Sequence, residues 1–455
     1  MRLIARYARE LADTYEIVTV WDEKTQREQT SKTDPHIATL SRRHPAAIWF
    51  ERKMHDDFGI VIDDAFDNRP MVHQERFPKG VHPMQKSFHE NSIEEADYMP
   101  YKYEAIGGDG VFEVAVGPIH AGIIEPGHFQ FSQAGEDILH QEVRHFYKYR
   151  AIEKMLEGKT LEEAKPVIER ISGNESIAYQ SAWRDIVLEA TGTQLPEANR
   201  RYHALLLEME RLIHHLTDLG FIPNDAGFGA ALAFASRLAE EARRMLRTLC
   251  GHRFGFGAID FEAHTLVREV FLAYLEALEK EVAFFEAWIL DIPSLWDRFD
   301  TTGILKKEKA VKYDTVGVVA RASGLGLDCR NNDFYRAHGF QMQIQQSADV
   351  SARFMVRLKE VQNSITMMRH FSMDRCEGVT PGSAKDGTYE AFVESSLGEL
   401  YMSVTLQNGV IDRFFVRDPS FMNWQALHLM MPNNIIADFP LINKSCDLSY
   451  AGNDL

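Results

Sequence analysis

The chain has 455 residues, which is long enough for one large domain and a second, smaller one. With 45% hydrophobic and 26% charged residues, its composition is that of an ordinary globular protein. The formal net charge of −17 argues against a nucleic-acid partner or an anionic lipid surface, and it favours a basic protein partner.

The apolar stretches and the cysteines indicate in which cellular compartment the chain is expected. No uninterrupted apolar run approaches the roughly 20 residues that a membrane-spanning helix needs. The N-terminal residues include arginines but no apolar core before a cleavage site, so we expect no signal peptide. The cysteines form no C-x-x-C motif, which is typical of free thiols in a reducing cytoplasm; they are Cys250, Cys329, Cys376 and Cys446.

Residues 1–95 are predicted to form a small α/β module. Apolar residues over Ile4–Leu11 have helical spacing, whereas Tyr15–Trp21 alternates as a strand does. The acidic, Tyr- and Gly-containing stretch 96–110 has the composition of a linker. It would connect this module to one large domain, residues 111–455.

The large domain is predicted to be mainly helical with a small antiparallel sheet, so the fold class is α+β. Alternation over Val111–Val116 and His128–Phe131 predicts two strands at its start. A strand pair, Leu400–Thr405 and Val410–Val416, flanks the turn-forming Asn-Gly sequence. From about residue 138 to 370 the apolar spacing is helical; the main predicted helices are Pro196–Leu216, Ala230–Cys250, His264–Leu290 and Gln341–His370.

Two segments of the first module carry a recognisable pattern. Glu51-Arg-Lys-Met-His-Asp-Asp-Phe-Gly-Ile60 precedes Gly80-Val-His-Pro-Met-Gln-Lys-Ser-Phe88. Together they resemble the signature region of the smaller, 30-kDa-type subunit of respiratory complex I. Fusion of such a module to a large subunit is a feature of the formate-hydrogenlyase type of hydrogenase.

Several segments of the large domain resemble, in the same order, the large subunit of membrane-bound energy-converting nickel–iron hydrogenases (hydrogenase-4 and formate-hydrogenlyase type). They equally resemble its homologue, the large peripheral-arm subunit of complex I. The segments are Gly117–Pro126, Tyr149–Thr160, Ala320–Arg330, Asp349–Leu358 and Arg417–Leu427. The resemblance implies the fold of that large subunit and a place in a membrane complex.

The metal ligands of those hydrogenases are absent. The family holds nickel and iron with four thiolates, and the matching positions here are Ser172, Glu175, Ser449 and Gly452. Thiolates suit these metals, whereas a serine hydroxyl stays protonated and glycine has no side chain. An arginine that leans over the metals in the family is replaced by Leu397. We therefore expect no nickel and no cofactor bound by this chain.

The residues at the first cysteine pair have a structural interpretation of their own. Ser172 and Glu175 stand three residues apart before an apolar run, which is the pattern of a capping box at a helix start. Such a cap contributes about 1 kcal/mol to a helix. The pattern predicts that hydrogen bonds replace the metal as the anchor of this helix.

Two residues of the opening loop are candidate catalytic groups. Glu125 stands where the resemblance places a proton-transfer glutamate, although helix N-terminal amides would also satisfy such a carboxylate. His120 matches a loop histidine of the complex I family that serves quinone chemistry, and an ordinary hydrogen-bonded loop histidine is the alternative. The family's quinone-binding tyrosine falls on Gly173, which has no donor.

The resemblance implies partners and a location. We expect a large-subunit homologue that holds an iron–sulfur small subunit and couples it to antiporter-like membrane subunits. The chain would lie on the cytoplasmic face of the cell membrane, with the iron–sulfur cluster in the partner. Two alternatives stay open: an oxidoreductase subunit using quinone or another acceptor in the remodelled cavity, and a purely structural scaffold.

Overall fold

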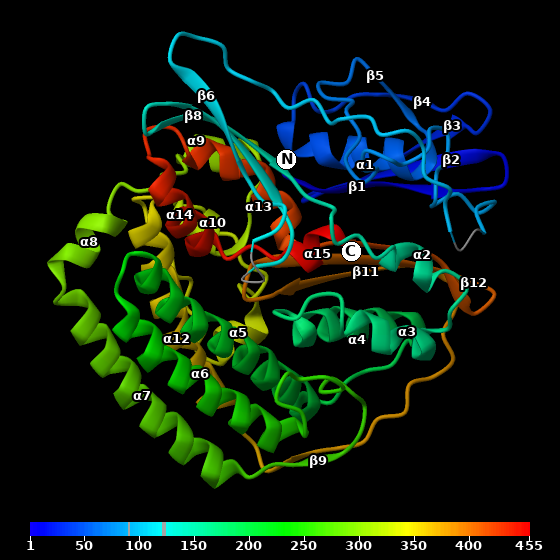
Figure 1. Cartoon of the computed structure of the whole chain (residues 1–455). Helices are drawn as coiled ribbons and strands as arrows, with labels where there is room; N and C mark the ends of the chain where they lie inside the picture. The colour runs from blue at the N-terminus through cyan, green and yellow to red at the C-terminus, as the bar shows by residue number, and fades with distance from the viewer. Residues whose placement is uncertain (90–91, 121–123) are drawn as a thin grey trace.

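The computed structural model describes residues 1–89, 92–120 and 124–455, and it has an α+β fold (Figure 1). The N-terminal part is a meander of β1 (Leu3–Glu10), β2 (Thr14–Trp21) and β3 (Thr25–Ser31), followed by a short parallel pair, β4 (His36–Ala38) and β5 (Val61–Asp63). Helix α1 (Ile48–Phe58) lies between the strands of that pair in sequence. The predicted strand over Tyr15–Trp21 is confirmed by β2.

The predicted helix over Ile4–Leu11 is wrong, because this segment is β1. Residues 3–8 are all buried, on both faces of the strand. On one face Ala8 packs in a cluster with Phe58 of α1, and on the other the Tyr7 ring stacks on Phe415 at 4.2 Å. A strand buried on both faces loses the polar–apolar alternation, and its apolar run then resembles that of a helix.

The large domain opens with a second antiparallel sheet in the order β6 (Val111–Val116), β7 (His128–Ala134) and β8 (Asp137–Arg144). The two predicted strands, Val111–Val116 and His128–Phe131, are confirmed by β6 and β7. The helical region begins later than predicted, since residues 137–144 extend the sheet. Part of the opening loop, residues 121–123, lies outside the described residues.

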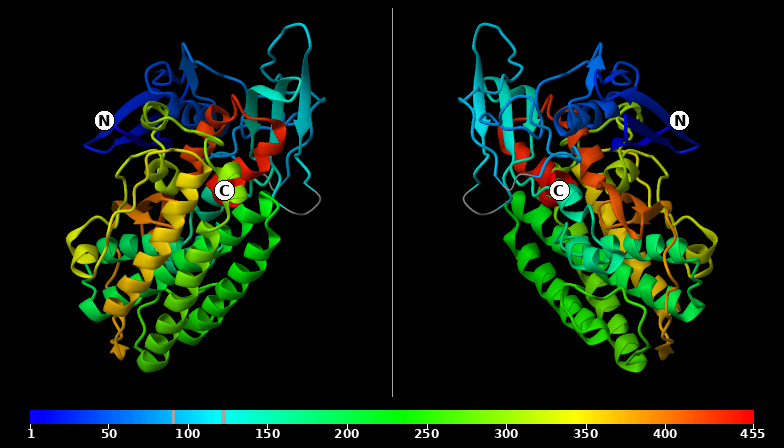
Figure 2. Two further views of the ribbon diagram at one scale, coloured as in Figure 1. Left: turned by 90° about the vertical axis from the view of Figure 1, so that its left-hand side faces the viewer. Right: turned by 90° about the vertical axis from the view of Figure 1, so that its right-hand side faces the viewer.

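The helical region packs as a bundle at the end of the molecule away from the N-terminal sheet (Figure 2). Helix α5 packs against both α6 and α12. Two predicted starts differ from the structure: α7 begins four residues after His264, and α12 begins at Val350, where the Asp349 side chain accepts from the Ala352 amide. The helices are α2 (Ile152–Leu156), α3 (Leu161–Ile168), α4 (Ser176–Thr191), α5 (Glu197–Asp225), α6 (Gly229–Cys250), α7 (Arg268–Leu290), α8 (Pro293–Phe299), α9 (Lys307–Lys312), α10 (Gly317–Ala322), α11 (Asp333–Ala337) and α12 (Val350–Phe371).

A third antiparallel sheet has the order β11 (Gly387–Glu394), β12 (Glu399–Gln407) and β13 (Val410–Arg417), which confirms the predicted strand pair. Asn408 and Gly409, both with positive φ, form the turn. Three α-helices follow: α13 (Pro419–Leu427), α14 (Phe439–Cys446) and α15 (Tyr450–Asp454). A two-residue ladder, β9 (His264–Thr265) with β10 (Arg375–Cys376), completes the strands of the described residues.

The N-terminal module and the large domain share one apolar core. The guanidinium of Arg417 donates to the Ile4 carbonyl, and the guanidinium of Arg413 donates to the Ala8 carbonyl; each N···O distance is 3.0 Å. The Tyr7 hydroxyl lies 2.9 Å from Ser403 Oγ. These contacts bind β1 to the third sheet, so the first module is a layer on the large domain. Among the described residues, no helix has the length and apolar character to cross a membrane.

Candidate functional site

The four positions matched to thiolates come together beside the start of α4 and the short C-terminal helix α15. Ser172 Oγ and Ser449 Oγ are 3.1 Å apart, and the Gly452 amide donates to Ser449 Oγ at 2.9 Å. Glu175 completes the group through Asp418, which lies against Gly452. All of these side chains are buried, Glu175 completely. The sequence therefore identified positions that are neighbours in space.

Asp418 is the member of this site that the sequence did not single out. Its Oδ1 accepts from the Ser420 amide at 2.7 Å, which caps α13, and its Oδ2 accepts from the Tyr179 hydroxyl at 2.8 Å. The signal was the Asp-Pro pair, since aspartate at the N-cap and proline at the next position mark a helix start. Its contact with Glu175 depends on tertiary structure.

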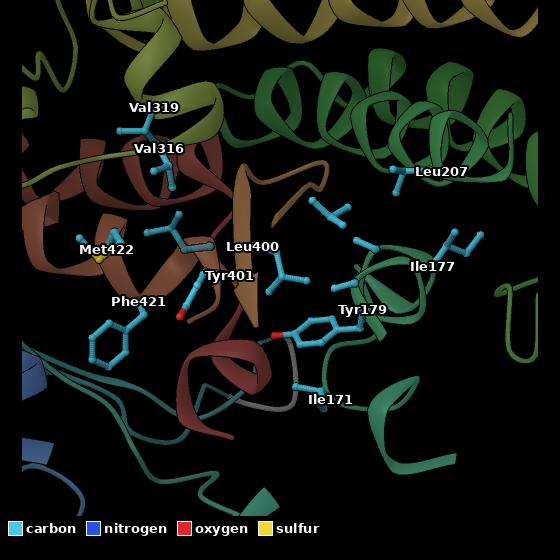
Figure 3. Close-up of a cluster of buried hydrophobic side chains, with 14 of the residues drawn as sticks. Ile171, Ile177, Tyr179, Leu207, Val316, Val319, Leu400, Tyr401, Phe421 and Met422 are labelled. Carbon is cyan, nitrogen blue, oxygen red and sulfur yellow. The ribbon is translucent and has the colours of Figure 1, made fainter. Parts of the chain in front are cut away.

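Glu175 and Asp418 form a pair of neighbouring buried carboxyls. Ser395 Oγ donates to Glu175 Oε1, while Oε2 is buried and has no donor among the described residues. Burial, together with the neighbouring Asp418, raises the pKa of the Glu175 carboxyl well above its usual range. Tyr179, which donates to Asp418, belongs to the buried apolar cluster that also includes Ile171 and Leu400 (Figure 3).

The predicted capping box at Ser172 and Glu175 is wrong. Helix α4 begins at Ser176, and Glu175 is its N-cap residue without a side-chain cap bond. Both side chains bond elsewhere, Ser172 to Ser449 and Glu175 to Ser395. The first amides of α4 are instead bound by Glu210 of α5, which accepts from Ile177 N at 2.6 Å and from Ala178 N at 3.0 Å.

Glu210 gives a testable pH dependence of stability. Burial raises its pKa to about 8 in the folded chain, against about 4.3 in an unfolded one. The folded state therefore holds a proton that the unfolded state releases, and the free energy of unfolding falls as pH rises between these values. Glu210→Gln, which mimics the neutral acid, is expected to make this fall shallower in denaturant unfolding at pH 5 to 8.

The control for this experiment is Glu241→Gln, at an exposed carboxyl of α6. Other buried acids also make the free energy of unfolding depend on pH in this range. The quantity to compare is therefore the slope of that free energy against pH in each variant. Equal slopes for the Glu210 variant and the unmodified protein would contradict the assignment.

Glu125 lies at the outer end of α15. It accepts from the Ala451 amide at 2.9 Å and forms an ion pair with Lys148. Its carboxylate is thus satisfied by a helix N-terminal amide and a lysine, and its side chain is 37% exposed. Because its side chain is partly exposed, whereas those of Glu175 and Asp418 are buried, Glu125 lies on the solvent side of the site.

His120 is hydrogen-bonded within the opening loop. Its Nε2–H donates to the Gly127 carbonyl at 2.7 Å. Among the described residues it has no hydrogen bond to the carboxyl pair. Its role as a catalytic group stays a prediction, as does that of Glu125.

Leu397 is buried in the turn between β11 and β12. Its amide and that of Gly398 each donate to Ser395 Oγ at 3.1 Å, so the turn fixes the hydroxyl that binds Glu175. An apolar side chain thus occupies the position matched to an arginine. Cys446, near the second pair of positions, is a buried free thiol.

The side chains of this site do not fit a nickel–iron centre. The available donors are hydroxyl and carboxyl oxygens bonded to one another, whereas nickel and iron in such centres are bridged by thiolates. In the parts of the chain that the structure describes, no group of three or more His, Cys, Asp or Glu side chains is arranged to hold a metal ion.

Comparison with known families divides the chain in two. Residues 6–94 match the family described as respiratory-chain NADH dehydrogenase, 30 Kd subunit. Residues 225–380 match the 49 Kd subunit of the same enzyme. The two matches follow one another in a single polypeptide, as the motifs indicated.

Similar proteins include subunits named for hydrogenases and a subunit named for NADH-quinone oxidoreductase. Formate hydrogenlyase subunit 5 of Escherichia coli is 28% identical over 94% of this chain and 79% of its own length. Hydrogenase-4 component G of the same organism is 28% identical over 91% and 75%. An NADH-quinone oxidoreductase subunit of Dehalococcoides mccartyi is 28% identical over 74% and 96%.

A chain of the membrane-bound sulfane sulfur reductase, an archaeal respiratory membrane complex, has the same fold. It superposes with a TM-score of 0.71 at 20% identity, over 76% of this chain and 99% of the other. The fold predicted from the resemblance is confirmed.

Proposed function

The chain is a homologue of membrane-bound hydrogenase and complex I large subunits, and we propose that it is the large subunit of a membrane-associated, redox-linked ion-translocating complex without a nickel–iron site. Its relatives include a subunit of NADH-quinone oxidoreductase and subunits of formate hydrogenlyase and hydrogenase-4. In this proposal its own contribution is assembly and coupling.

The observation that carries the proposal is the chemistry at the four converging positions. Ser172 and Ser449 bond to each other, and Glu175 bonds to Ser395. Asp418 fills the space beside Gly452, because a Cβ on that glycine would lie 2.0 Å from Asp418 Oδ2. Hydrogen-bonded oxygens therefore stand at or beside the positions that the resemblance matches to thiolates, which supports a site without metal.

The partners follow from the same homology. The proposed assembly contains an iron–sulfur small subunit and antiporter-like membrane subunits, with this chain peripheral on the cytoplasmic side. The net charge of −17 suits a basic partner surface. Quinone turnover in this chain has less support, because Gly173 stands at the tyrosine position and His120 is bonded to the Gly127 carbonyl.

Affinity purification of the tagged chain from detergent-solubilised membranes tests this proposal. The expected result is co-purification of an iron–sulfur protein and large membrane subunits, in a complex that evolves no hydrogen from a reduced viologen dye. A nickel–iron hydrogenase complex measured in parallel is the positive control. Hydrogen evolution by the purified complex, or recovery of the chain without any membrane protein, would contradict the proposal.

A further inference from the structure

Two carboxyl groups face each other in the core without a cation between them. Glu175 is 0% exposed and Asp418 is 1% exposed, and the two carboxyls are close neighbours. Among the described residues, the hydrogen-bond donors to the two carboxyls are neutral: Ser395 donates to Glu175, and Tyr179 and the Ser420 amide donate to Asp418. Two neighbouring ionised carboxylates in a medium of low polarity repel each other, which favours a proton at this place.

The groups around the pair donate hydrogen bonds but little positive charge. Tyr179 of α4, the Ser420 amide of α13 and Ser395 of the β11–β12 turn each donate to one carboxyl oxygen. These donors stabilise one negative charge spread over two carboxyls. They leave Glu175 Oε2 buried without a donor, which is costly unless a proton supplies the missing hydrogen bond.

The charged residues nearby are committed to other partners. Arg150, before α2, donates to the carbonyls of Ile171 and Ala451, and Arg211 of α5 donates to those of Glu394 and Ser395. The third acid facing the pair, Glu210 of α5, adds a like charge when ionised. Burial followed by these acidic neighbours raises the pKa of Glu175 well above its usual range.

The glycine at position 452 makes room for the pair. Its place in α15 is so close to Asp418 that any Cβ would overlap the carboxylate. The glutamate at 175 and the glycine at 452 thus depend on each other through Asp418. Positions 175 and 452, both matched to metal ligands, are therefore explained together by the carboxyl of Asp418, which lies beside each of them.

We propose that Glu175 and Asp418 are a proton-binding site, in which one proton is held between the two carboxyls in place of the metal centre. This inference rests on the proposed function and deepens it, since it names the ligand that the metal-free site would bind. Binding adds one proton to the doubly ionised pair and leaves a single negative charge. Release returns the proton without any change in oxidation state.

Infrared spectroscopy of the intact purified complex tests the site directly. A protonated carboxyl has a C=O stretch that ionised carboxylates lack, and labelling glutamate or aspartate with ¹³C assigns the band. The expected result is a carboxylic C=O band at pH 7 in the unmodified complex that disappears in Glu175→Gln. The same band is expected to shift or disappear in Asp418→Asn, because the proton is shared.

Two controls separate the pair from its surroundings. Glu210→Gln is expected to remove a different band, and Glu241→Gln none. The ¹³C label gives the residue type of each band, and the Glu175→Gln and Glu210→Gln spectra together separate the two glutamate bands. The spectra are repeated with and without Na⁺ and Mg²⁺.

Three results would overturn the inference. The first is a complex at pH 7 without a carboxylic band from glutamate or aspartate. The second is a Glu175 band that Asp418→Asn leaves unchanged, which would mean an independent buried acid. The third is a band that vanishes when Na⁺ or Mg²⁺ is added, which would mean a hard-cation site. Stoichiometric nickel would instead refute the proposed function, so the two failures are distinguishable.

Discussion

Replacing Arg321 by methionine is expected to lower the free energy of unfolding by about 3–5 kcal/mol, because it removes the cation that two buried acids, Glu360 and Glu394, share. Arg321, on α10, is 0% exposed. Its Nε donates to Glu360 at 2.8 Å and its Nη1 to Glu394 at 2.6 Å, and Asp328 lies 3.3 Å away. Methionine fills a similar volume but neutralises none of these acids.

The pKa of Glu360 shows the same dependence, whereas burial and the neighbouring Asp328 raise the pKa of Glu394 to about 7. Arg321, despite the opposing effect of burial, holds the pKa of Glu360 well below its usual range, with His215 and Arg330 contributing. Chemical denaturation at neutral pH measures the loss. The control is Arg336→Met, at an ion pair with Asp333 whose arginine is 51% exposed, which is expected to cost less than about 1 kcal/mol. A comparable small cost for Arg321→Met would show that the cluster does not depend on this cation.

Replacing Gly452 by alanine is the second change with a large expected effect. The added methyl would lie 2.0 Å from Asp418 Oδ2, so the carboxyl or α15 must move. Overpacking of a dense interior costs about 1–3 kcal/mol and occasionally more. Movement of Asp418 would also weaken its bonds with Tyr179 and with the Ser420 amide. For a chain of this length, we expect the midpoint of thermal unfolding to fall by about 1–3 °C.

Gly173→Ala is the matched control in the same site, because a Cβ there meets nothing within 4 Å. It is expected to leave the unfolding midpoint nearly unchanged. The steric cause is tested in an Asp418→Ala background, where Gly452→Ala should cost less than in the unmodified protein. Additive effects of the two substitutions would contradict a direct clash.

Much of the fold could be predicted where local pattern and tertiary structure agree. The Asn-Gly turn and its flanking alternation identified β12 and β13, and Pro196 marked the start of α5. The prediction failed for β1, because α1 covers one face of this strand and the third sheet the other. The expected start of α12 was also nine residues too early, since the first turn needs the cap of Asp349.

The sequence predicted which positions form the candidate site, but it did not predict their hydrogen-bond partners. Resemblance placed Ser172, Glu175, Ser449 and Gly452 at one site, and the structure brings them together. The local spacing suggested a capping box, but the stronger partners of Glu175 come from residues 395 and 418, more than 200 positions away. Neither spacing nor periodicity carries information about such a contact.

Metal analysis of the purified, membrane-derived complex is the sharpest test of whether hydrogen-bonded oxygens have replaced the nickel–iron centre. Nickel and iron are measured by mass spectrometry against the amount of this chain, with a nickel–iron hydrogenase complex prepared in the same way as the standard. We expect iron from the clusters of the partner subunit and nickel far below one atom per chain. Nickel close to one atom per chain, lost when Ser172 and Glu175 are both replaced by alanine, would contradict this replacement.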